Sequence, residues 1–342
     1  MENFDENVYD RVVVNSDPDF IENDSGNVSA SYVILCEQNF DNENSRMYEQ
    51  KIAGISLAEW VSMACETKPT FLTIDKNEKL ANFIKPCLSE KDYLVVLYAD
   101  TPLVSKTHLK DLLCYVDRKR LNVCKLKRGF ILKNSYAKQV DDFYFGLAYD
   151  LSTNDFFQVK TFNDIDKVKS TLESRMFNYH KKNGVFFENQ NTTVVDANVK
   201  IGKGSFISAG STILDGSVIG ENVFVGNNVY ISNSNIWVGS KVFSKCVIEN
   251  SIVKDNSKIG LDSLLSYSVV SSETEIGVSS RFVKSAIGEN CIIGNFCNFE
   301  NANVLNGAKI GSYSAVIGEN VTINIEEKAV ISAGSKIVKK EE

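Results

Sequence analysis

The chain has 342 residues, enough for two or three domains. Its net charge of -7 argues against a nucleic-acid partner, and no apolar run approaches the roughly 18 residues that span a membrane. The eight cysteines include no Cys-x-x-Cys pair, only two histidines are present, and the first residues lack a signal-peptide pattern. We therefore expect reduced thiols, no structural zinc site, no membrane association and a cytoplasmic location.

The first 28 residues predict an acidic, solvated extension, with eight Asp or Glu residues against a single base, Arg11. Residues 29–162 then alternate apolar runs with helical patterns, which predicts an α/β layer. The run at 93–98 is apolar throughout, as expected for a strand covered on both faces of a parallel sheet. The expected elements are strands at 32–35, 70–74 and 93–98, helices from 57 to about 66 and from 107 to about 119, and candidate strands at 129–132 and 143–147. Ser56 and Thr107 are the expected helix caps.

Residues 163–185 predict a long connecting helix, from Asp164 to about Lys182. Asn163 is suited to cap its first turn, and Gly184 is suited to end it. His180 lies on this helix, where we expect a surface position.

The region 186–340 carries an aliphatic residue at every sixth position, with an occasional step of five. A six-residue repeat predicts a parallel β-helix, in which each hexad forms one side of a coil and coils stack about 4.8 Å apart. An α-helix is excluded because six is not a multiple of 3.6. On this pattern a turn takes eighteen residues, and the Gly or Asn beside the aliphatic residue permits the corner. The series begins Val195, Ile201, Ile207, Ile213, Ile219, Val225 and Ile231, and continues through Ile310.

This order of domains resembles the family of the bifunctional N-acetylglucosamine-1-phosphate uridyltransferase and glucosamine-1-phosphate acetyltransferase, GlmU. Segments 181–185, 193–202 and 210–213 are similar to that family's junction, and 97–103 is similar to its Gly-Asp-Thr-Pro-Leu strand end. The resemblance implies a shortened nucleotidyltransferase-like α/β domain followed by a left-handed parallel β-helix of hexapeptide repeats. It also implies a homotrimer assembled through that helix.

The resemblance further implies UDP-N-acetylglucosamine formation from UTP and N-acetylglucosamine 1-phosphate, with Mg²⁺ held by Asp100 and Asn163. Such chemistry needs a cation that bridges phosphates, and strand ends of α/β sheets commonly bind ligands. Both residues also have structural interpretations, Asp100 as an Asx turn before Pro102 and Asn163 as a helix cap. Both interpretations stay open at this point.

The segment 35–47 stands where the family has a glycine-rich phosphate loop, yet it contains no glycine and carries three acidic residues. Arg46 matches the family arginine, and Lys51 is a shifted candidate for the family lysine; these are the expected catalytic residues. The uridine-binding glycine segment has no counterpart between Ile74 and Asp92. Because preorganised donors are missing, we expect weak pyrophosphorylase activity.

The acetyltransferase histidine of the family falls on Asn295, which cannot act as a general base near neutral pH. We therefore expect the acetyltransferase site to be lost. Two main hypotheses stay open: a divergent sugar-nucleotide enzyme that binds a sugar nucleotide or sugar phosphate, and a non-catalytic trimeric scaffold or sugar-nucleotide-sensing subunit. An acyltransferase on another substrate is disfavoured.

Overall fold

The computed structural model describes residues 28–38, 46–75, 80–140, 149–151 and 154–340. The chain divides into two compact units, residues 1–176 and 177–342. The boundary lies inside helix α6 (Phe162–Lys182). The acidic extension and the candidate strand at 143–147 lie outside the described residues. No helix within these ranges is long and apolar enough to cross a membrane.

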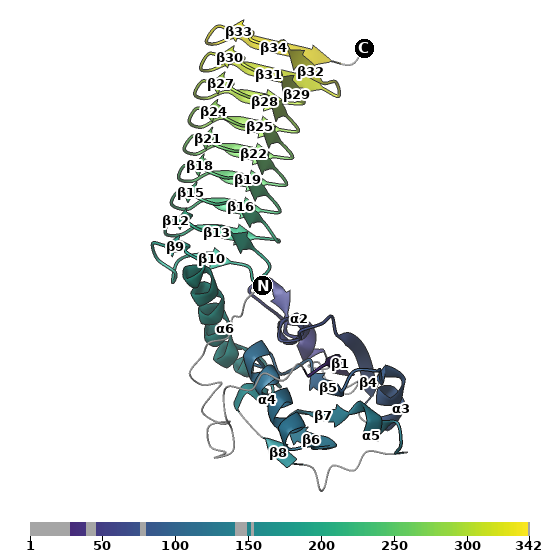
Figure 1. Ribbon diagram of the computed structural model, residues 1–342. Helices are drawn as coiled ribbons and strands as arrows, with labels where there is room; N and C mark the ends of the chain where they lie inside the picture. The colour runs from purple at the N-terminus through teal and green to yellow at the C-terminus, as the bar shows by residue number, and fades with distance from the viewer. Residues whose placement is uncertain (1–27, 39–45, 76–79, 141–148, 152–153, 341–342) are drawn as a thin grey trace. The chain divides into compact units, whose positions relative to one another are not determined.

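The first unit is built on a mixed sheet whose strand order, within the described residues, is β4-β1-β5-β7-β6-β8 (Figure 1). Strands β4, β1 and β5 run parallel, and β7 is antiparallel to both β5 and β6. The elements are β1 (Ala30–Gln38), η2 (Met47–Glu49), β2 (Lys51–Ile52), β3 (Ile55–Ser56), α2 (Leu57–Met63), β4 (Thr70–Asp75), α3 (Leu80–Ile84), η3 (Lys85–Cys87), β5 (Tyr93–Tyr98), α4 (Lys106–Arg118), β6 (Val123–Leu126), β7 (Gly129–Lys133), α5 (Asn134–Ala137), β8 (Tyr149–Leu151) and η4 (Asn154–Phe156).

Strand β5 is buried from Tyr93 to Leu97, which confirms the expectation of a strand covered on both faces. Successive side chains of a strand point to opposite faces, so the sheet has two apolar layers. Val95 and Leu97 pack with helices α2 and α4, whereas Leu94 and Val96 pack with α3 and α5. The α/β architecture expected from the sequence is thus confirmed.

Of the two expected helix caps in the first unit, one is confirmed and the other is wrong. Ser56 caps α2 in a reciprocal capping box with Glu59, as expected. Helix α4, however, is capped by Ser105 and not Thr107, because the Ser105 hydroxyl accepts from the N–H of His108 at 3.2 Å.

Helix α6 begins at Phe162, so the expectation that Asn163 caps it is wrong. The Asp164 carboxylate instead accepts from the N–H groups of Lys160 and Thr161, at 3.2 and 3.1 Å. Gly184 does end the helix, with a φ of +81° and a hydrogen bond from the N–H of Val185 to the carbonyl of His180. His180 itself is buried, contrary to expectation, because its ring packs beside Phe187 of the first coil.

The second unit is a parallel β-solenoid of about nine turns, as the hexad pattern predicted (Figure 1). Its aliphatic series is buried along all three faces, and Leu265, Phe282 and Phe299 are buried on the first face in the same way. The first face comprises β10 (Val194–Val195), β13 (Thr212–Leu214), β16 (Tyr230–Ser232), β19 (Val247–Glu249), β22 (Leu264–Ser266), β25 (Arg281–Val283), β28 (Asn298–Glu300), β31 (Ala315–Glu319) and β34 (Lys336–Lys340).

The second face comprises β11 (Lys200–Ile201), β14 (Val218–Ile219), β17 (Asn235–Ile236), β20 (Ile252–Val253), β23 (Val269–Val270), β26 (Ala286–Ile287), β29 (Ala302–Val304) and β32 (Ile323–Ile325). The third comprises β9 (Phe186–Phe187), β12 (Phe206–Ile207), β15 (Phe224–Val225), β18 (Lys241–Val242), β21 (Lys258–Ile259), β24 (Glu275–Ile276), β27 (Ile292–Ile293), β30 (Lys309–Ile310) and β33 (Val330–Ile331).

The turn length differs from the expected eighteen residues over most of the solenoid. Early coils pair with an offset of 18, as in Phe206 with Phe224, and the following coils pair with an offset of 17, as in Val247 with Leu264. The last coil is longer and pairs with an offset of 21, as in Lys309 with Val330. The change from 18 to 17 occurs where the two left-handed residues Asp215 and Gly216 of one corner are replaced by a single one, Asn233, in the next coil. One residue of positive φ is enough for that corner, so the turn shortens by one.

The glycines that follow the aliphatic residues have a different role from the one expected. The structure gives no positive φ at Gly260; a Cβ there would lie 2.4 Å from the carbonyl carbon of Gly277 in the next coil. These glycines therefore permit the close approach of neighbouring coils. The left-handed corners are formed largely by non-glycine residues, such as Asn250 and Tyr267.

A ladder of buried serines joins successive coils. The N–H of Ser251 donates to the hydroxyl of Ser234, and the N–H of Ser268 donates to that of Ser251, both at 3.0 Å. The Ser251 hydroxyl in turn donates to the carbonyl of Glu249 at 2.7 Å. Polar groups that would be costly inside the coil are thereby satisfied.

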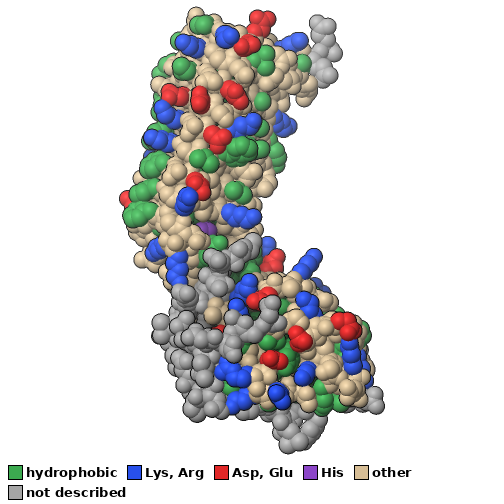
Figure 2. Space-filling view, viewed as in Figure 1, with side chains coloured by type: hydrophobic (Ala, Val, Ile, Leu, Met, Phe, Trp, Pro, Cys, Tyr) green, Lys and Arg blue, Asp and Glu red, His purple; other side chains and the backbone are tan. Residues whose placement is uncertain are grey.

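Aromatic side chains form a separate row outside the coil. Phe186, Phe206 and Phe224 stack on neighbouring strands, with ring centroids 4.8 and 5.8 Å apart. Trp237 and Phe243 are also exposed, so they do not interrupt the internal aliphatic rows. On the face shown in Figure 2, hydrophobic side chains lie among charged ones.

Candidate functional site: the carboxyl edge of the α/β sheet

Three charged residues meet at one edge of the sheet because of its strand directions. Glu37 lies near the end of β1, and Asp100 follows β5, so the parallel strands deliver both carboxylates to the same edge. Arg128 comes from the turn between β6 and β7. The pairing of Gly129 with Leu97 places this turn beside the end of β5. Ligands of α/β sheets commonly bind at such carboxyl ends.

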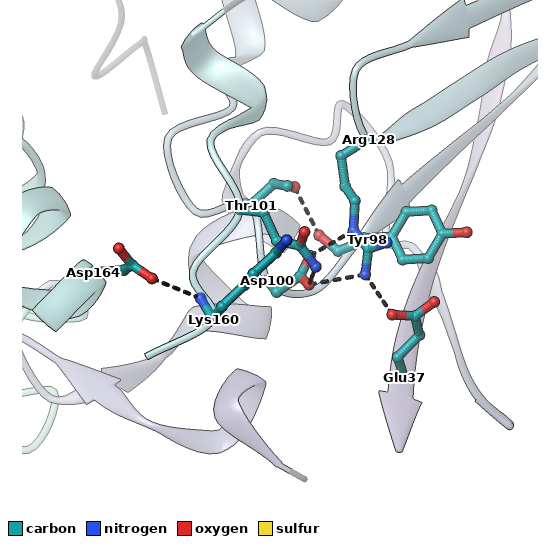
Figure 3. Close-up of polar contacts among 8 residues, drawn as sticks. Glu37, Tyr98, Asp100, Thr101, Arg128, Lys160 and Asp164 are labelled. Carbon is teal, nitrogen blue, oxygen red and sulfur yellow. Dashed lines mark hydrogen bonds and ion pairs between the residues drawn. The ribbon is translucent and has the colours of Figure 1, made fainter. Parts of the chain in front are cut away.

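Arg128 binds both carboxylates at once (Figure 3). Its Nη2 lies 2.5 Å from Glu37 Oε2 and 2.9 Å from Asp100 Oδ2, and its Nε donates to Asp100 Oδ1 at 3.2 Å. The contact with Asp100 is therefore bidentate, the arrangement that gives an arginine–carboxylate pair its strength and fixed orientation.

Two further side chains complete this environment. The Arg128 guanidinium lies over the ring of Tyr98, 3.8 Å from its centroid, in cation–π geometry. Gln158 Nε2 donates to Asp100 Oδ2 at 2.8 Å, and a bond from the N–H of Val159 to the carbonyl of Asp100 holds this segment in place.

The charged side chains are mostly shielded, with side-chain exposures of 19% for Arg128, 23% for Glu37 and 16% for Asp100. Burial by itself lowers the pKa of Arg128, but the hydrogen bonds and charges of Asp100 and Glu37 outweigh it and raise that pKa above its usual value. The guanidinium is therefore charged at any physiological pH.

The predicted Mg²⁺ ligands do not form an open pair in this arrangement. Both oxygens of Asp100 already accept hydrogen bonds from Arg128 and Gln158, and the positive charge of the guanidinium opposes a metal cation beside it. Asn163 lies exposed in the first turn of α6. Across the described parts of the chain, no group of three or more His, Cys, Asp or Glu residues could hold a metal ion. Mg²⁺ binding by Asp100 and Asn163 stays a prediction.

The predicted catalytic residues make local contacts. Arg46 precedes η2, and its Nη1 lies 3.6 Å from Glu49 Oε1 with both side chains exposed. Lys51 is exposed in β2, where its backbone pairs with Ser56 of β3. Residues 39–45 of the glycine-free segment lie outside the described ranges.

From the sequence, only candidate strands, 129–132 and 143–147, were expected between residues 121 and 162, and neither Arg128 nor Gln158 was singled out. A usable signal was present: two basic residues, Lys127 and Arg128, join the apolar strands β6 and β7 of a hairpin. Gly129 has a φ of +123°, and a Cβ there would lie 2.4 Å from the carbonyl oxygen of Val96. Only glycine can follow Arg128 in this geometry.

Asn295, which replaces the acetyltransferase histidine, has a structural role in the solenoid. Its Oδ1 accepts from the N–H of Val278 at 3.0 Å, and its own N–H donates to the Ser312 hydroxyl. Its amide therefore joins neighbouring coils at a corner.

Residues 190–285 match the family model of the GMPPB C-terminal domain. The matched residues lie wholly inside the solenoid, and the α/β unit is outside the match. A comparison with curated proteins gave no match. The similarity thus extends to the solenoid of a nucleotidyltransferase family and does not single out the bifunctional family that the sequence resembles.

Proposed function

We propose that this protein is a non-catalytic relative of the sugar nucleotidyltransferases. In this role the α/β unit is a closed structural module and the β-solenoid is the surface through which copies assemble. The observation that carries the proposal is the engagement of both Asp100 oxygens by Arg128 and Gln158.

Charge at the carboxyl edge supports this proposal. Nucleotidyl transfer needs a cation and preorganised donors around a triphosphate. Here one guanidinium is shared between two carboxylates, so Glu37, Asp100 and Arg128 together carry a net charge of -1. The carboxylates repel a polyphosphate at this edge, and the guanidinium is already paired with them.

The second candidate is a working enzyme, favoured by the family match. GMPPB denotes a mannose-1-phosphate guanylyltransferase-like protein, which suggests GTP and mannose 1-phosphate as substrates. The resemblance in sequence suggests UTP and N-acetylglucosamine 1-phosphate instead. In either activity Asp100 and Asn163 would hold Mg²⁺ while Arg46 and Lys51 contact the triphosphate, and the cation would compete with the Arg128 guanidinium for Asp100.

Pyrophosphate release from both substrate pairs, with Mg²⁺ and with EDTA, distinguishes the two candidates. We expect no metal-dependent turnover from the folded chain. Metal-dependent turnover that disappears in Asp100→Asn but persists in Glu90→Gln, an exposed carboxylate bound to Lys138, would establish the enzyme and refute our proposal. Binding of UDP-N-acetylglucosamine and GDP-mannose, measured by calorimetry, tests a sugar-nucleotide-sensing role separately.

The scaffold role predicts a homotrimer through the solenoid. Sedimentation equilibrium should give three times the 38.1 kDa chain mass. A monomer at micromolar concentration would remove the assembly part of the proposal.

A further inference from the structure

Asparagine is followed by glycine at two places in the chain, Asn183–Gly184 and Asn306–Gly307. An asparagine in this sequence can lose its side-chain amide, because the glycine has no Cβ to hinder attack of its backbone nitrogen on the asparagine side-chain carbonyl carbon. The attack needs a glycine nitrogen released from its hydrogen bond and an asparagine side chain that is free to turn towards it. The two sites can therefore be compared by the bonds that hold them.

The first site is held by a local bond. Asn183 directly follows the last residue of helix α6 and is exposed. The Gly184 N–H donates to the carbonyl of Lys181 at 3.0 Å, within the same helical turn. In the part of the chain that the structure describes, the Asn183 side chain makes no hydrogen bond. Because helix ends open readily, the local bond can break while the solenoid stays folded.

The second site is held by the neighbouring coil of the solenoid. Asn306 Oδ1 accepts from the N–H of Glu289 at 2.8 Å, which fixes the side chain. The N–H of Gly307 donates to the carbonyl of Glu289 at 2.7 Å. Both bonds join one coil to the next, so they open only when the two coils separate. Asn306 is therefore protected for as long as the coils stay stacked.

We infer that Asn183 is a site of spontaneous deamidation and that its modification loosens the junction between helix α6 and the first coil. The Gly184 nitrogen forms a bond to Asn183 Cγ, the Cγ–Nδ2 bond breaks, and ammonia leaves with the proton of the glycine nitrogen. Water then opens the cyclic imide to give aspartate or isoaspartate. This inference is independent of the proposed function.

The loosening follows from the charge and the length of the product. Both products place a negative charge at the carboxyl end of α6, where the helix dipole disfavours it. Isoaspartate also adds one carbon to the backbone, inside the turn that the bond from the N–H of Val185 to the carbonyl of His180 closes. The modified turn therefore fits the first coil less well than the natural one.

Peptide mass spectrometry of the full chain, incubated at about pH 8.5, measures deamidation at both sites as a gain of about one mass unit. In the folded chain we expect conversion at Asn183 to be at least about tenfold faster than at Asn306. In denaturant the two sites should convert at similar rates, because glycine follows both. Equal rates in the folded chain, or faster conversion at Asn306, would overturn the inference.

Anion exchange separates the deamidated chain, which should melt at a lower temperature than the unmodified chain. Asn183→Gln lengthens the side chain and should abolish the early, more acidic species, whereas Asn306→Gln should leave it. Equal melting temperatures of the two forms would refute the loosening of the junction, and an acidic species that survives Asn183→Gln would refute the site. Neither result depends on nucleotide or Mg²⁺, so it is separate from the outcome of the turnover assay.

Discussion

Acidification should destabilise the junction between helix α6 and the first coil of the solenoid, through His180. The ring of this residue is 2% exposed and packs against Tyr179 and Phe187, at centroid distances of 5.4 and 6.2 Å. Its Nδ1 finds no hydrogen-bond partner within the described structure. Burial therefore lowers the pKa of His180 from 6.5 to about 4.

Because the pKa of His180 is lowered in the folded chain, the folded state loses stability as the pH falls. The unfolded chain takes up a proton near pH 6.5, whereas the folded chain resists it until about pH 4. The neutral ring thus contributes stability in full above pH 6.5, and the contribution is lost as the pH falls towards 4. At about 1.4 kcal/mol per pKa unit, the whole loss is roughly 3 kcal/mol, of which about 2 kcal/mol has occurred by pH 5.

Denaturant unfolding at pH 7 and pH 5 measures this loss. The His180→Phe variant keeps an apolar ring and cannot be protonated, so its decrease in unfolding free energy should be smaller than that of the natural chain by about 2 kcal/mol. Lys181→Gln, an exposed change on the same helical turn, should behave like the natural chain.

A direct titration provides the second readout. The chain contains two histidines, so the carbon-bound imidazole signals are readily assigned with His180→Phe. The reasoning is refuted if His180 titrates near pH 6.5, or if His180→Phe and the natural chain lose equal stability between pH 7 and pH 5.

Three further changes test the packing described above. Gly260→Ala should lower the melting temperature more than Gly334→Ala, because a Cβ at position 260 would lie 2.4 Å from neighbouring backbone. A Cβ at position 334 would meet open space, so that variant has only the cost of a φ of +73°. Equal losses would contradict the close-approach argument. Ser251→Ala should cost about 1–3 kcal/mol in denaturant unfolding because the N–H of Ser268 loses its acceptor. Ser251→Cys should cost less, because it places here the residue that another face of the solenoid carries at the corresponding hexad position, Cys297. Ser56→Ala should cost about 1 kcal/mol by loss of the capping box, and no change would indicate that water replaces it.

The solenoid was predictable because its information is local and repeated. Each hexad places one aliphatic residue inward, and the repetition makes the pattern visible without knowledge of distant contacts. The same regularity concealed the turn length, since the shorter corner at Asn233 depends on a backbone conformation and not on composition. It also concealed the reason for Gly260, which is the proximity of the next coil.

The strands of the α/β unit were largely predictable as well, and for a similar reason. Apolar runs such as 93–98 indicate burial on both faces wherever the strand lies in the sheet. Helix caps were less certain because neighbouring Ser and Thr residues compete, as the cap at Ser105 shows. His180 was misplaced because a helix residue near a junction can be covered by the next element.

The sequence by itself determined the two kinds of domain, their order, and the position of Asp100 at a strand end. Only the tertiary structure decided what surrounds that carboxylate. Arg128 is 28 positions from Asp100 and 91 from Glu37, and no local pattern relates them. The pairing of β5 with β1 and β7 brings them together, because strand direction determines which turns share an edge. Local periodicity is encoded in neighbouring residues, whereas the charge balance of a site depends on which distant segments the fold makes adjacent.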